Sequence, residues 1–280
     1  MASVKSPIRT LLKPILFKML GKNGYKWAQY YAKRKDIEKR LVEEVEMELL
    51  PVLVGKQDEV LDIGANFAYY TERLSRLVPE GQVYAFEPIP FTYDVARLLV
   101  KKFRLKNVTL YHKGVGQKTE VLRFSVPKMS FGSISAGQAH VTGRDDNAIK
   151  GTNYYVSDQN EEFDCEVIDI DSFLLPKLKN LSFVKIDIEG AEYFALKGME
   201  NTIRQFKPVI LIEIVPQFLK GFSIETPFFQ QYIEQDLGYG IYEYDKQAKK
   251  LALLAGPLVK DRNYLLIPSD KLSGFKHIMI

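Results

Sequence analysis

The fold is decided at residues 60–71, which read VLDIGANFAYYT. A short apolar run ends there at Gly64, and a helical pattern begins at residue 66. A glycine turn between a strand and a helix N-terminus lets the backbone approach a ligand closely and leaves free N–H groups to bind it. The stretch therefore predicts the first strand of a ligand-binding α/β sheet.

Strand and helix patterns alternate along the chain around this stretch. We expect helices over residues 66–78, 90–103 and 191–203. The last two predicted strands have no long helix between them, so they suit an antiparallel edge. The pattern predicts an α/β fold with a doubly wound, mostly parallel seven-stranded sheet. Its strands are expected at residues 59–63, 82–86, 108–111, 182–188, 209–215, 239–244 and 264–267.

Residues 117–165 interrupt this alternation. A strand pattern at 121–126 leads into a polar, glycine-rich stretch, and a strand pattern resumes at 163–168. Because this insertion leaves the sheet near the mouth of the expected crevice, it is predicted to form a lid or an acceptor site. His140 within it is a candidate catalytic base.

Residues 1–50 are predicted to form a basic helical arm in front of a domain spanning 51–280. Residues 1–40 hold eleven Lys and Arg but only two acidic residues, although the net charge of the whole chain is only +4. Three interpretations stay open for the arm. It is a helical cap on the domain, an interfacial helix on anionic lipid, or a targeting segment.

Local signals predict how the arm is divided. Apolar residues at spacings of three and four predict a first helix with one apolar face. Pro14 is expected to break or kink this helix, and Gly21 and Gly24 are expected to end it. A second, highly charged helix is predicted over residues 27–50.

Composition excludes several classes of protein. An apolar fraction of 46% provides enough material for a core, so disorder is excluded as the bulk state. Apolar runs are too short for a membrane span. The single cysteine, Cys165, cannot form an internal disulfide, so a cytoplasmic setting is expected.

The stretch around Gly64 does not fit a nicotinamide dehydrogenase. Positions 64, 66 and 69 hold Gly, Asn and Tyr, so the Gly-x-Gly-x-x-Gly fingerprint fails. Glu87 ends the next strand, where an acid can accept hydrogen bonds from both ribose hydroxyls. A glycine turn and a ribose carboxylate without a diphosphate loop indicate S-adenosylmethionine (SAM).

Four segments together resemble the FkbM family of SAM-dependent methyltransferases. The resemblance covers about residues 58–215 and departs at Ala68, where the family usually has glycine. It implies a Rossmann-like SAM methyltransferase fold and O-methylation, often of a sugar or polyketide hydroxyl. The segments are VLDIGANFAYYT (60–71), VYAFEPIP (83–90), NVTLYHKGVG (107–116) and FVKIDIEGAEYFALKGM (183–199), with PVILIEI (208–214) also similar.

By position, the resemblance implies a cofactor site at the strand ends. The DIGAN turn surrounds the methionine part of SAM, Glu87 holds the ribose, and Gly114 and Val115 lie against the adenine. The predicted cofactor-binding residues are Asp62, Gly64, Ala65, Asn66, Tyr70, Thr71, Glu87, Pro88, Gly114, Val115 and Asp187.

Carboxylates at the ends of later strands are candidates for the chemistry. Methyl transfer to an alcohol needs in-line positioning and a base near the hydroxyl. Asp187 and Glu189 end the strand at 182–188, so with His140 they are the candidate catalytic residues, and Asp187 could instead hold the methionine ammonium. Lys185 is expected to pair with one of these acids. Asp187 and Glu213 are weak candidates for a Mg²⁺ site.

The sequence thus predicts a SAM-dependent O-methyltransferase that acts on a hydroxyl of a sugar or glycolipid. The alternative is a non-catalytic SAM-fold adaptor or partner subunit. Nucleic acid is a less favoured partner, because the net charge of residues 41–280 is negative and few aromatic residues interleave with the basic residues of the arm. Peripheral contact with a membrane is expected through residues 1–40.

Overall fold

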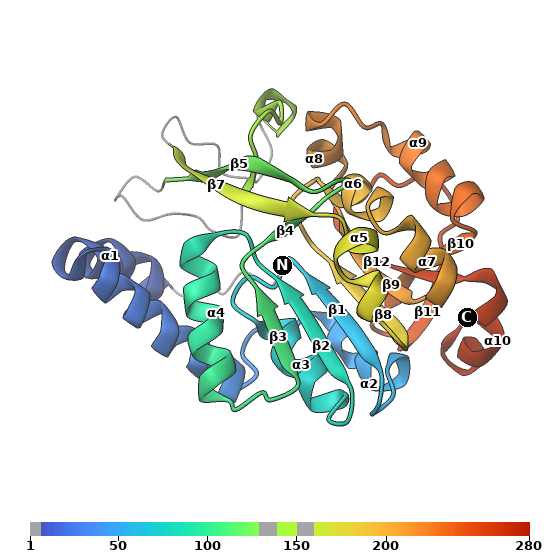
Figure 1. The fold of residues 1–280 in the computed structure, drawn as a ribbon, viewed down its shortest axis with the longest axis horizontal. Coiled ribbons are helices and arrows are strands. Elements are labelled where there is room, and N and C mark those ends of the chain that lie inside the picture. Colours follow the sequence, from blue (N-terminus) through green and yellow to red (C-terminus); the bar gives the residue numbers. More distant parts are fainter. Residues whose placement is uncertain (1–6, 129–138, 150–159) are drawn as a thin grey trace.

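The computed structural model describes residues 7–128, 139–149 and 160–280; the side chains of residues 7–20, 22, 146 and 149 are not described. Its centre is an eight-stranded sheet in the order β11-β10-β12-β9-β8-β1-β2-β3 (Figure 1). The five strands from β9 to β3 are parallel, and β12, β10 and β11 are antiparallel. The bounds are β1 Glu59–Ile63, β2 Gln82–Phe86, β3 Val108–Tyr111, β8 Leu181–Ile186, β9 Val209–Ile214, β10 Tyr239–Asp245, β11 Lys250–Leu253 and β12 Arg262–Pro268.

The predicted α/β class is confirmed, with one strand more than expected. The bounds of β1, β2 and β3 agree with the prediction. The strand count of seven was wrong, because β11 extends the antiparallel edge by pairing with β10. This strand is short, and the prediction missed it although residues 251–255 form an apolar run, LALLA.

Side chains alternate along the strands and build a core on each face of the sheet. Leu61 and Val184 pack with the helices that follow β8. Val60 and Phe183, their neighbours in sequence, face the other side and pack with α2 and α3. Complete burial of such a side chain stabilises the fold by about 1.5–3 kcal/mol.

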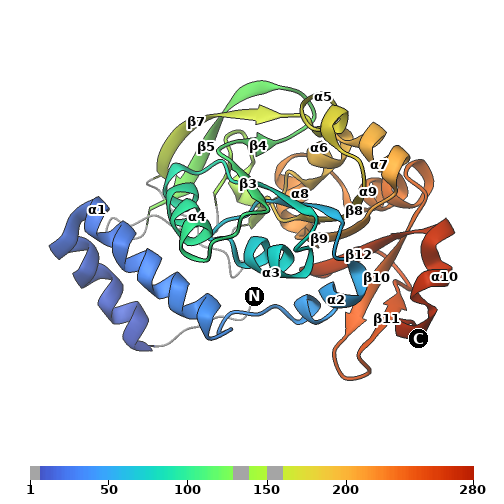
Figure 2. The same ribbon diagram turned by 60° about the horizontal axis from the view of Figure 1, so that its bottom comes forward.

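Short helices cover the two faces of the sheet (Figures 1 and 2). They are α2 Leu50–Leu53, α3 Tyr69–Leu77, α4 Pro90–Lys102, α5 Ile170–Phe173, α6 Glu192–Lys197, α7 Glu200–Phe206, α8 Pro216–Gly221, α9 Thr226–Gln231 and α10 Leu272–Phe275. Single turns lie at Val45–Glu48, Asp146–Ile149, Leu175–Lys177, Tyr232–Asp236, Ser269–Lys271 and Lys276–Ile278.

Two predicted helices differ from those observed. α3 begins at Tyr69 rather than at residue 66, because Asn66 and Ala68 have φ of 48° and 61°, which no right-handed helix contains. The helix predicted over 191–203 is divided into α6 and α7. A Cβ on Gly198, between them, would lie 1.9 Å from the Gly116 carbonyl oxygen, so only glycine allows this close approach.

A second sheet lies beyond the carboxyl ends of β1, β2 and β3 (Figure 1). Its order is β4-β7-β5-β6, with bounds β4 Gly114–Val115, β5 Glu120–Pro127, β6 His140–Val141 and β7 Asn160–Ile168. The strand patterns at 121–126 and 163–168 therefore belong to this sheet and pair antiparallel with each other. Most of the predicted polar stretch falls in 129–138 and 150–159, outside the described residues.

The arm is a bent helix, α1 Pro7–Glu38 (Figure 2). The prediction of a break at Pro14 was wrong, since the backbone leaves helical geometry only at Gly21, with φ 61° and ψ −174°. The second helix does not continue to residue 50. Arg40 takes a φ of 51°, and the Leu41 N–H donates to the Asp36 carbonyl, which ends the helix in a left-handed turn. Among the described residues, no helix combines the length and apolar character that crossing a bilayer requires.

Candidate active site

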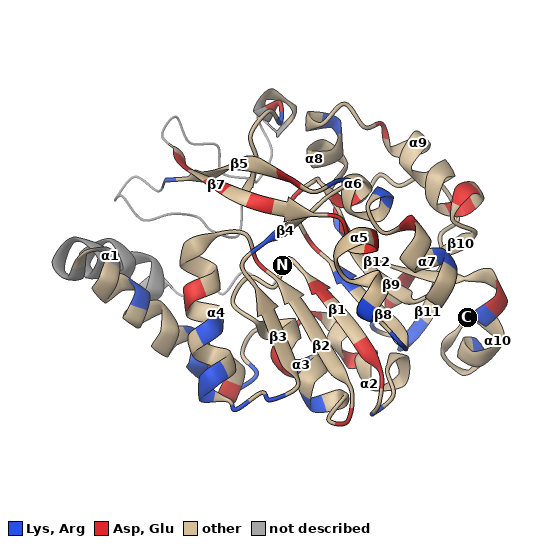
Figure 3. Cartoon of the chain, in the orientation of Figure 1, with Lys and Arg blue, Asp and Glu red and all other residues tan. Residues whose placement is uncertain are grey.

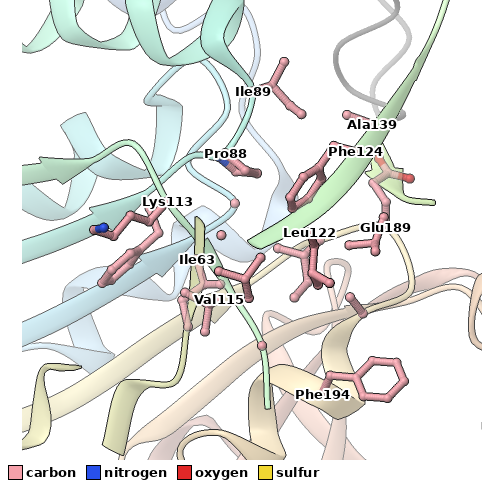
Figure 4. Close-up of a pocket in the computed structure, with 18 of the residues that line it drawn as sticks. Ile63, Pro88, Ile89, Lys113, Val115, Leu122, Phe124, Ala139, Glu189 and Phe194 are labelled. Carbon is pink, nitrogen blue, oxygen red and sulfur yellow. The ribbon is translucent and has the colours of Figure 1, made fainter. Parts of the chain in front are cut away.

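A cavity of about 570 Å³ lies between the carboxyl ends of the central strands and the second sheet. Figure 4 shows Leu122, Phe124 and Glu189 on one side of it, with Ile63 and Val115 opposite. The cavity therefore occupies the position where open α/β sheets bind their ligands.

The turn after β1 is held by its neighbours. Thr71 donates a hydrogen bond of 2.5 Å to the buried Asp62 carboxylate, which fixes α3 to the end of β1. Burial raises the pKa of Asp62 to about 6, against the opposing effect of Thr71. Gly64 has φ 85°, and a Cβ there would lie 1.9 Å from the Asp187 carbonyl oxygen. Glycine is therefore required at this position chiefly because the Asp187 carbonyl, just after β8, lies so close to it.

Glu87 is a buried acid whose carboxylate is fixed from several sides. Its Oε1 accepts hydrogen bonds from the Ile89 N–H at 2.9 Å and the Thr92 hydroxyl at 2.7 Å. Its Oε2 accepts the Asn66 N–H at 2.8 Å. Burial raises the pKa of Glu87 to about 7, although these donors favour the charged form. Glu87 lines the cavity, and Oε2 keeps a lone pair for a further donor.

The predicted adenine position lies in the second sheet. Gly114 and Val115 form β4, and both line the cavity with Pro88. A Cβ on Gly114 would lie 2.9 Å from Val167 Cγ2, so packing of β4 on β7 also requires a small residue here.

Lys185 and Asp187 form a buried ion pair at the end of β8. Their Nζ and Oδ2 atoms are 3.0 Å apart, and the Lys185 ammonium also lies 5.0 Å from the centre of the Tyr70 ring. The predicted pairing of Lys185 is confirmed. Burial alone would raise the pKa of Asp187, but the Lys185 charge outweighs it and holds that pKa below the usual value. Asp187, which lines the cavity, is therefore ionised.

Glu213 on β9 interacts with Asp187. Burial and the Asp187 charge raise the pKa of Glu213 well above its usual value, so its protonated carboxyl donates to Asp187. Lys185 supplies the positive charge at this pair. Within the part of the chain that is described, no three His, Cys, Asp or Glu side chains are grouped to hold a metal.

Glu189 lies in a strained loop beside the cavity. Its φ is 57°, and Arg144 Nη1 donates to its carbonyl oxygen at 3.1 Å. Burial, together with the Asp187 charge, raises the pKa of Glu189 well above its usual value. Glu192 supports this loop by accepting the Ile188 and Gly190 N–H groups on its Oε1. Backbone strain of this kind occurs at functional sites.

Five predicted cofactor-binding or catalytic residues do not line the cavity: Asp62 and Ala65, which are buried, and His140, Tyr70 and Thr71. His140 is buried in β6, between Ala139 and Val141, which do line it. Since side chains alternate along a strand, His140 faces the opposite side. Tyr70 and Thr71 lie on α3, where they bind Glu44 and Asp62.

Glu44 is a cavity residue that the sequence did not indicate. It follows α1, and its Oε2 accepts the Tyr70 hydroxyl at 2.7 Å and Asn263 Nδ2 at 3.0 Å. The prediction of a helix over 27–50 hid it, and its partners are remote in sequence. The acidic residues between positions 43 and 48 were the only, and weak, indication in the sequence that this segment has a role in the site.

The wall also has an apolar part, beside the polar lining residues Lys113, Gln117, Lys118, Glu120 and Thr142. The apolar part combines side chains of the second sheet with those of the segments after β8 and β9. Its residues are Leu122, Phe124, Val141, Phe194 and Phe222. Sequence reasoning missed them because no local pattern shows that β5, β6 and α6 meet.

Two buried oxygen atoms that lack a hydrogen-bond partner among the described residues indicate what the cavity binds. They are Asn66 Oδ1 and Glu189 Oε2, and both residues line the cavity. Buried acceptors in proteins are normally satisfied, so a ligand with N–H or O–H groups is expected there. Together with Asp187 and Glu87, which also line the cavity, these acceptors fit a ligand that carries an ammonium and hydroxyl groups, as SAM does.

The match to known proteins covers the strands and helices that build this site. Residues 62–241 match the Methyltransferase FkbM domain. "Methyltransferase 1" of Beauveria bassiana (strain ARSEF 2860) is 25% identical over 150 residues, which are 51% of this chain and 58% of that protein. The chain therefore spans little more than half the length of this curated relative.

Two solved structures are among those similar to this chain. Methyltransferase FkbM from Methylobacillus flagellatus KT is 14% identical with a TM-score of 0.43, covering 85% of this chain and 59% of that one. A putative O-methyltransferase from Klebsiella pneumoniae is 13% identical with a TM-score of 0.45, covering 92% and 96%. Because the family match extends over more than half of its residues, the chain belongs to the FkbM methyltransferase family, whose methyl donor is SAM.

Proposed function

We propose that this methyltransferase transfers the methyl group of SAM to a hydroxyl of a sugar or glycolipid. One observation carries the proposal. The buried carboxyl of Glu189 has an oxygen without a partner among the described residues, at the wall of a cavity that also holds the ionised Asp187. A carboxyl group placed in this way can accept a proton from an alcohol.

The strand ends hold the cofactor in this proposal. When bound, SAM supplies a methyl group on a sulfonium, which an alcohol oxygen can attack. Glu87 Oε2 accepts a ribose hydroxyl beside the Asn66 N–H that it already binds. Asp187 and Glu44 both line the cavity and would hold the methionine ammonium. Gly114 leaves room for the flat adenine ring.

Glu189 acts as the base. Its raised pKa makes the deprotonated carboxylate a stronger proton acceptor than an exposed glutamate. With SAM bound, the acceptor hydroxyl would donate to Glu189 Oε2 and its oxygen would bond to the methyl carbon as the carbon–sulfur bond breaks. S-adenosylhomocysteine would leave, and the proton of the hydroxyl would move to Glu189. Arg144 and Glu192 fix the loop, so the carboxyl is held in place before the substrate arrives.

The apolar wall supports an amphiphilic acceptor. Phe194 and Phe222 offer flat apolar faces for the C–H side of a sugar ring, and Leu122 and Phe124 continue this wall. The carboxyl of Glu189 is the polar group next to it. Because a glycolipid resides in a membrane, the enzyme would reach it from the bilayer surface.

Calorimetry and methyl transfer test the proposal. SAM is expected to bind to the wild-type protein, and labelled methyl from SAM should appear as an alkali-stable ether in a glycolipid extract. Glu189→Gln should lower kcat by about 10²–10⁴-fold with an unchanged affinity for SAM. Glu192→Gln, at the start of α6 and outside the cavity lining, keeps an oxygen for the Ile188 and Gly190 N–H groups, so it is the matched control and should retain most of the activity.

Other results would overturn this assignment. Binding of SAM without transfer to any extract would support a non-catalytic adaptor. An N-methylated or S-methylated product would exclude the hydroxyl acceptor. Equal kcat for Glu189→Gln and the wild type would remove Glu189 from the mechanism.

A further inference from the structure

One face of α1 is fixed to the methyltransferase domain. Tyr25 stacks on Phe91 of α4 with ring centres 5.8 Å apart, and Lys26 forms an ion pair with Asp94 at 3.1 Å. Further along the helix, the Tyr69 hydroxyl donates to the Asp36 carboxylate at 3.2 Å. These contacts hold the second half of α1 at one end of the molecule (Figures 1 and 2). The second half of α1 therefore packs on the domain through one face, which leaves the opposite face open to a partner.

The opposite face presents three aromatic rings that pack mainly on one another. Trp27, Tyr30 and Tyr31 follow at helical spacing, and their ring centres are 5.1–6.4 Å apart. Trp27 is 48% exposed and Tyr31 is 60% exposed. Rings with an apolar body and a polar tip are typical of surfaces that lie at the headgroup level of a bilayer. We call Trp27, Tyr30 and Tyr31 the aromatic face.

Basic residues are frequent in the segment that carries the aromatic face. Residues 25–40 hold six Lys and Arg and two acids, within a segment 1–40 that holds eleven basic residues. Lys35, Lys39 and Arg40 are exposed. Figure 3 shows these charges along the described part of α1. Each basic residue near an anionic bilayer contributes about 1 kcal/mol to binding.

We propose that the aromatic face of α1 and its basic neighbours bind the surface of an anionic lipid bilayer. Charge complementarity selects a negative partner, and the aromatic rings select one with an apolar layer below its charges. Apolar residues recur at spacings of three and four along residues 8–20 of the sequence, which a bilayer interface accommodates. An apolar stripe of this kind does not contribute to binding a nucleic acid.

Binding of α1 to a bilayer would take place close to the cavity. The chain runs from the end of α1 through only five residues to Glu44 in the cavity wall. Contact of α1 with lipid would therefore bring the cavity close to an acceptor that lies in the bilayer. The binding surface itself stands independently of the proposed function, since it rests on α1 alone.

Trp27 is the single tryptophan of the chain, so its fluorescence reports on the proposed contact directly. Vesicles of phosphatidylcholine with about 30% phosphatidylserine should shift its emission to the blue and sediment the full-length protein. Pure phosphatidylcholine vesicles should do so weakly. Added salt and the variant Lys35→Gln/Lys39→Gln should both reduce binding to the anionic vesicles.

Two double variants distinguish binding through the aromatic face from nonspecific adsorption through other exposed apolar side chains. Trp27→Ala/Tyr31→Ala should lower vesicle partitioning about tenfold without changing Tm, because both side chains are exposed. Phe228→Ala/Leu253→Ala removes comparably exposed apolar groups, 52% and 62%, from α9 and β11 and should leave it unchanged.

Three results would overturn the proposal. One is an unshifted Trp27 emission with anionic vesicles. Another is equal sedimentation of the wild type and the aromatic variant. The third is binding of single-stranded RNA that depends on Trp27 and Tyr31 when vesicle binding does not, which would assign the surface to nucleic acid.

Discussion

Lys185 Nζ lies 3.0 Å from Asp187 Oδ2, and only 2% of the lysine side chain is exposed against 29% of the aspartate. The pair thus spans the border between the sheet and the cavity. Glu44, Glu213 and Asp62 also act on the lysine charge. One buried cation therefore keeps a group of acids compatible with folding and leaves Asp187 ionised where it faces the ligand.

Loss of the Lys185 ammonium should strongly destabilise the fold. Lys185→Met leaves Asp187 and its acidic neighbours without a counter-charge, so the free energy of unfolding should fall by about 3–5 kcal/mol, measured by denaturant titration. Lys207→Met is the control, because its pair with Asp270 is half exposed and should contribute less than about 1 kcal/mol. Equal losses for the two variants would contradict the central role of Lys185.

Gly64 should tolerate no side chain. Its positive φ resembles that of Gly238, but a Cβ on Gly64 would meet the Asp187 carbonyl oxygen at 1.9 Å, whereas Gly238 has nothing within 4 Å. Gly238→Ala should therefore cost about 1 kcal/mol, the strain of left-handed backbone. Gly64→Ala should cost more than about 4 kcal/mol or prevent folding, which thermal melts would reveal. Similar Tm values for both variants would exclude the close approach as the cause.

The sequence predicted the parts of this structure that depend on local pattern. The strands from 59 to 111, the turn at Gly64 and the acids at the end of β8 were found because apolar runs, glycines and charges mark them. Glu44 was missed because its hydrogen bond to Asn263 crosses 219 residues of sequence. The apolar wall was missed for the same reason, since the pairing of β5 with β7 brings its residues together.

Ala68 illustrates what conformation adds to a sequence pattern. Its departure from the glycine of the family raised a question about the methionine end of the site. Ala68 has φ 61° and is buried at the start of α3. The left-handed backbone explains why glycine suits this position, because glycine adopts it without strain. Ala68 does not line the cavity, so the substitution affects the turn rather than the cofactor contacts.

The stability of the ligand-free protein should fall as the pH rises from about 5 to 7. Burial raises the pKa of Glu192 and of Glu87 to about 7 and of Asp62 to about 6. The folded state therefore holds these protons when the unfolded chain, with pKa values near 4, has lost them. Each group can lower the free energy of unfolding by up to about 1.4 kcal/mol per pH unit in this window.

Glu192→Gln tests this pH dependence for one group. Glutamine keeps an oxygen for the Ile188 and Gly190 N–H groups but cannot lose a proton. Denaturant titrations from pH 5 to 8 should show a shallower decline of stability for this variant than for the wild type. A parallel decline would mean that Glu192 is already charged in the folded protein at pH 5.

Glu44 should contribute to binding the amino-acid end of the cofactor. Glu44→Gln removes the charge that faces the methionine ammonium in the proposed function, so SAM and S-adenosylhomocysteine should bind about tenfold more weakly by calorimetry. 5′-Methylthioadenosine, which lacks the ammonium, should bind with unchanged affinity. Glu43→Gln is the control, because Glu43 pairs with Arg40 at the surface. An equal loss for all three ligands would point to a structural role through Tyr70 and Asn263.

The pH dependence of turnover should identify Glu189 as the base. The burial that raises its pKa favours the protonated carboxyl, which cannot accept the acceptor's proton. Turnover at saturating SAM should therefore rise with pH through the raised pKa of Glu189 and level off above it. Glu189→Gln should be slow at every pH and lose this inflection, whereas Glu192→Gln should keep it. An inflection that survives in Glu189→Gln would assign the titration, and with it the proton transfer, to another group of the cavity.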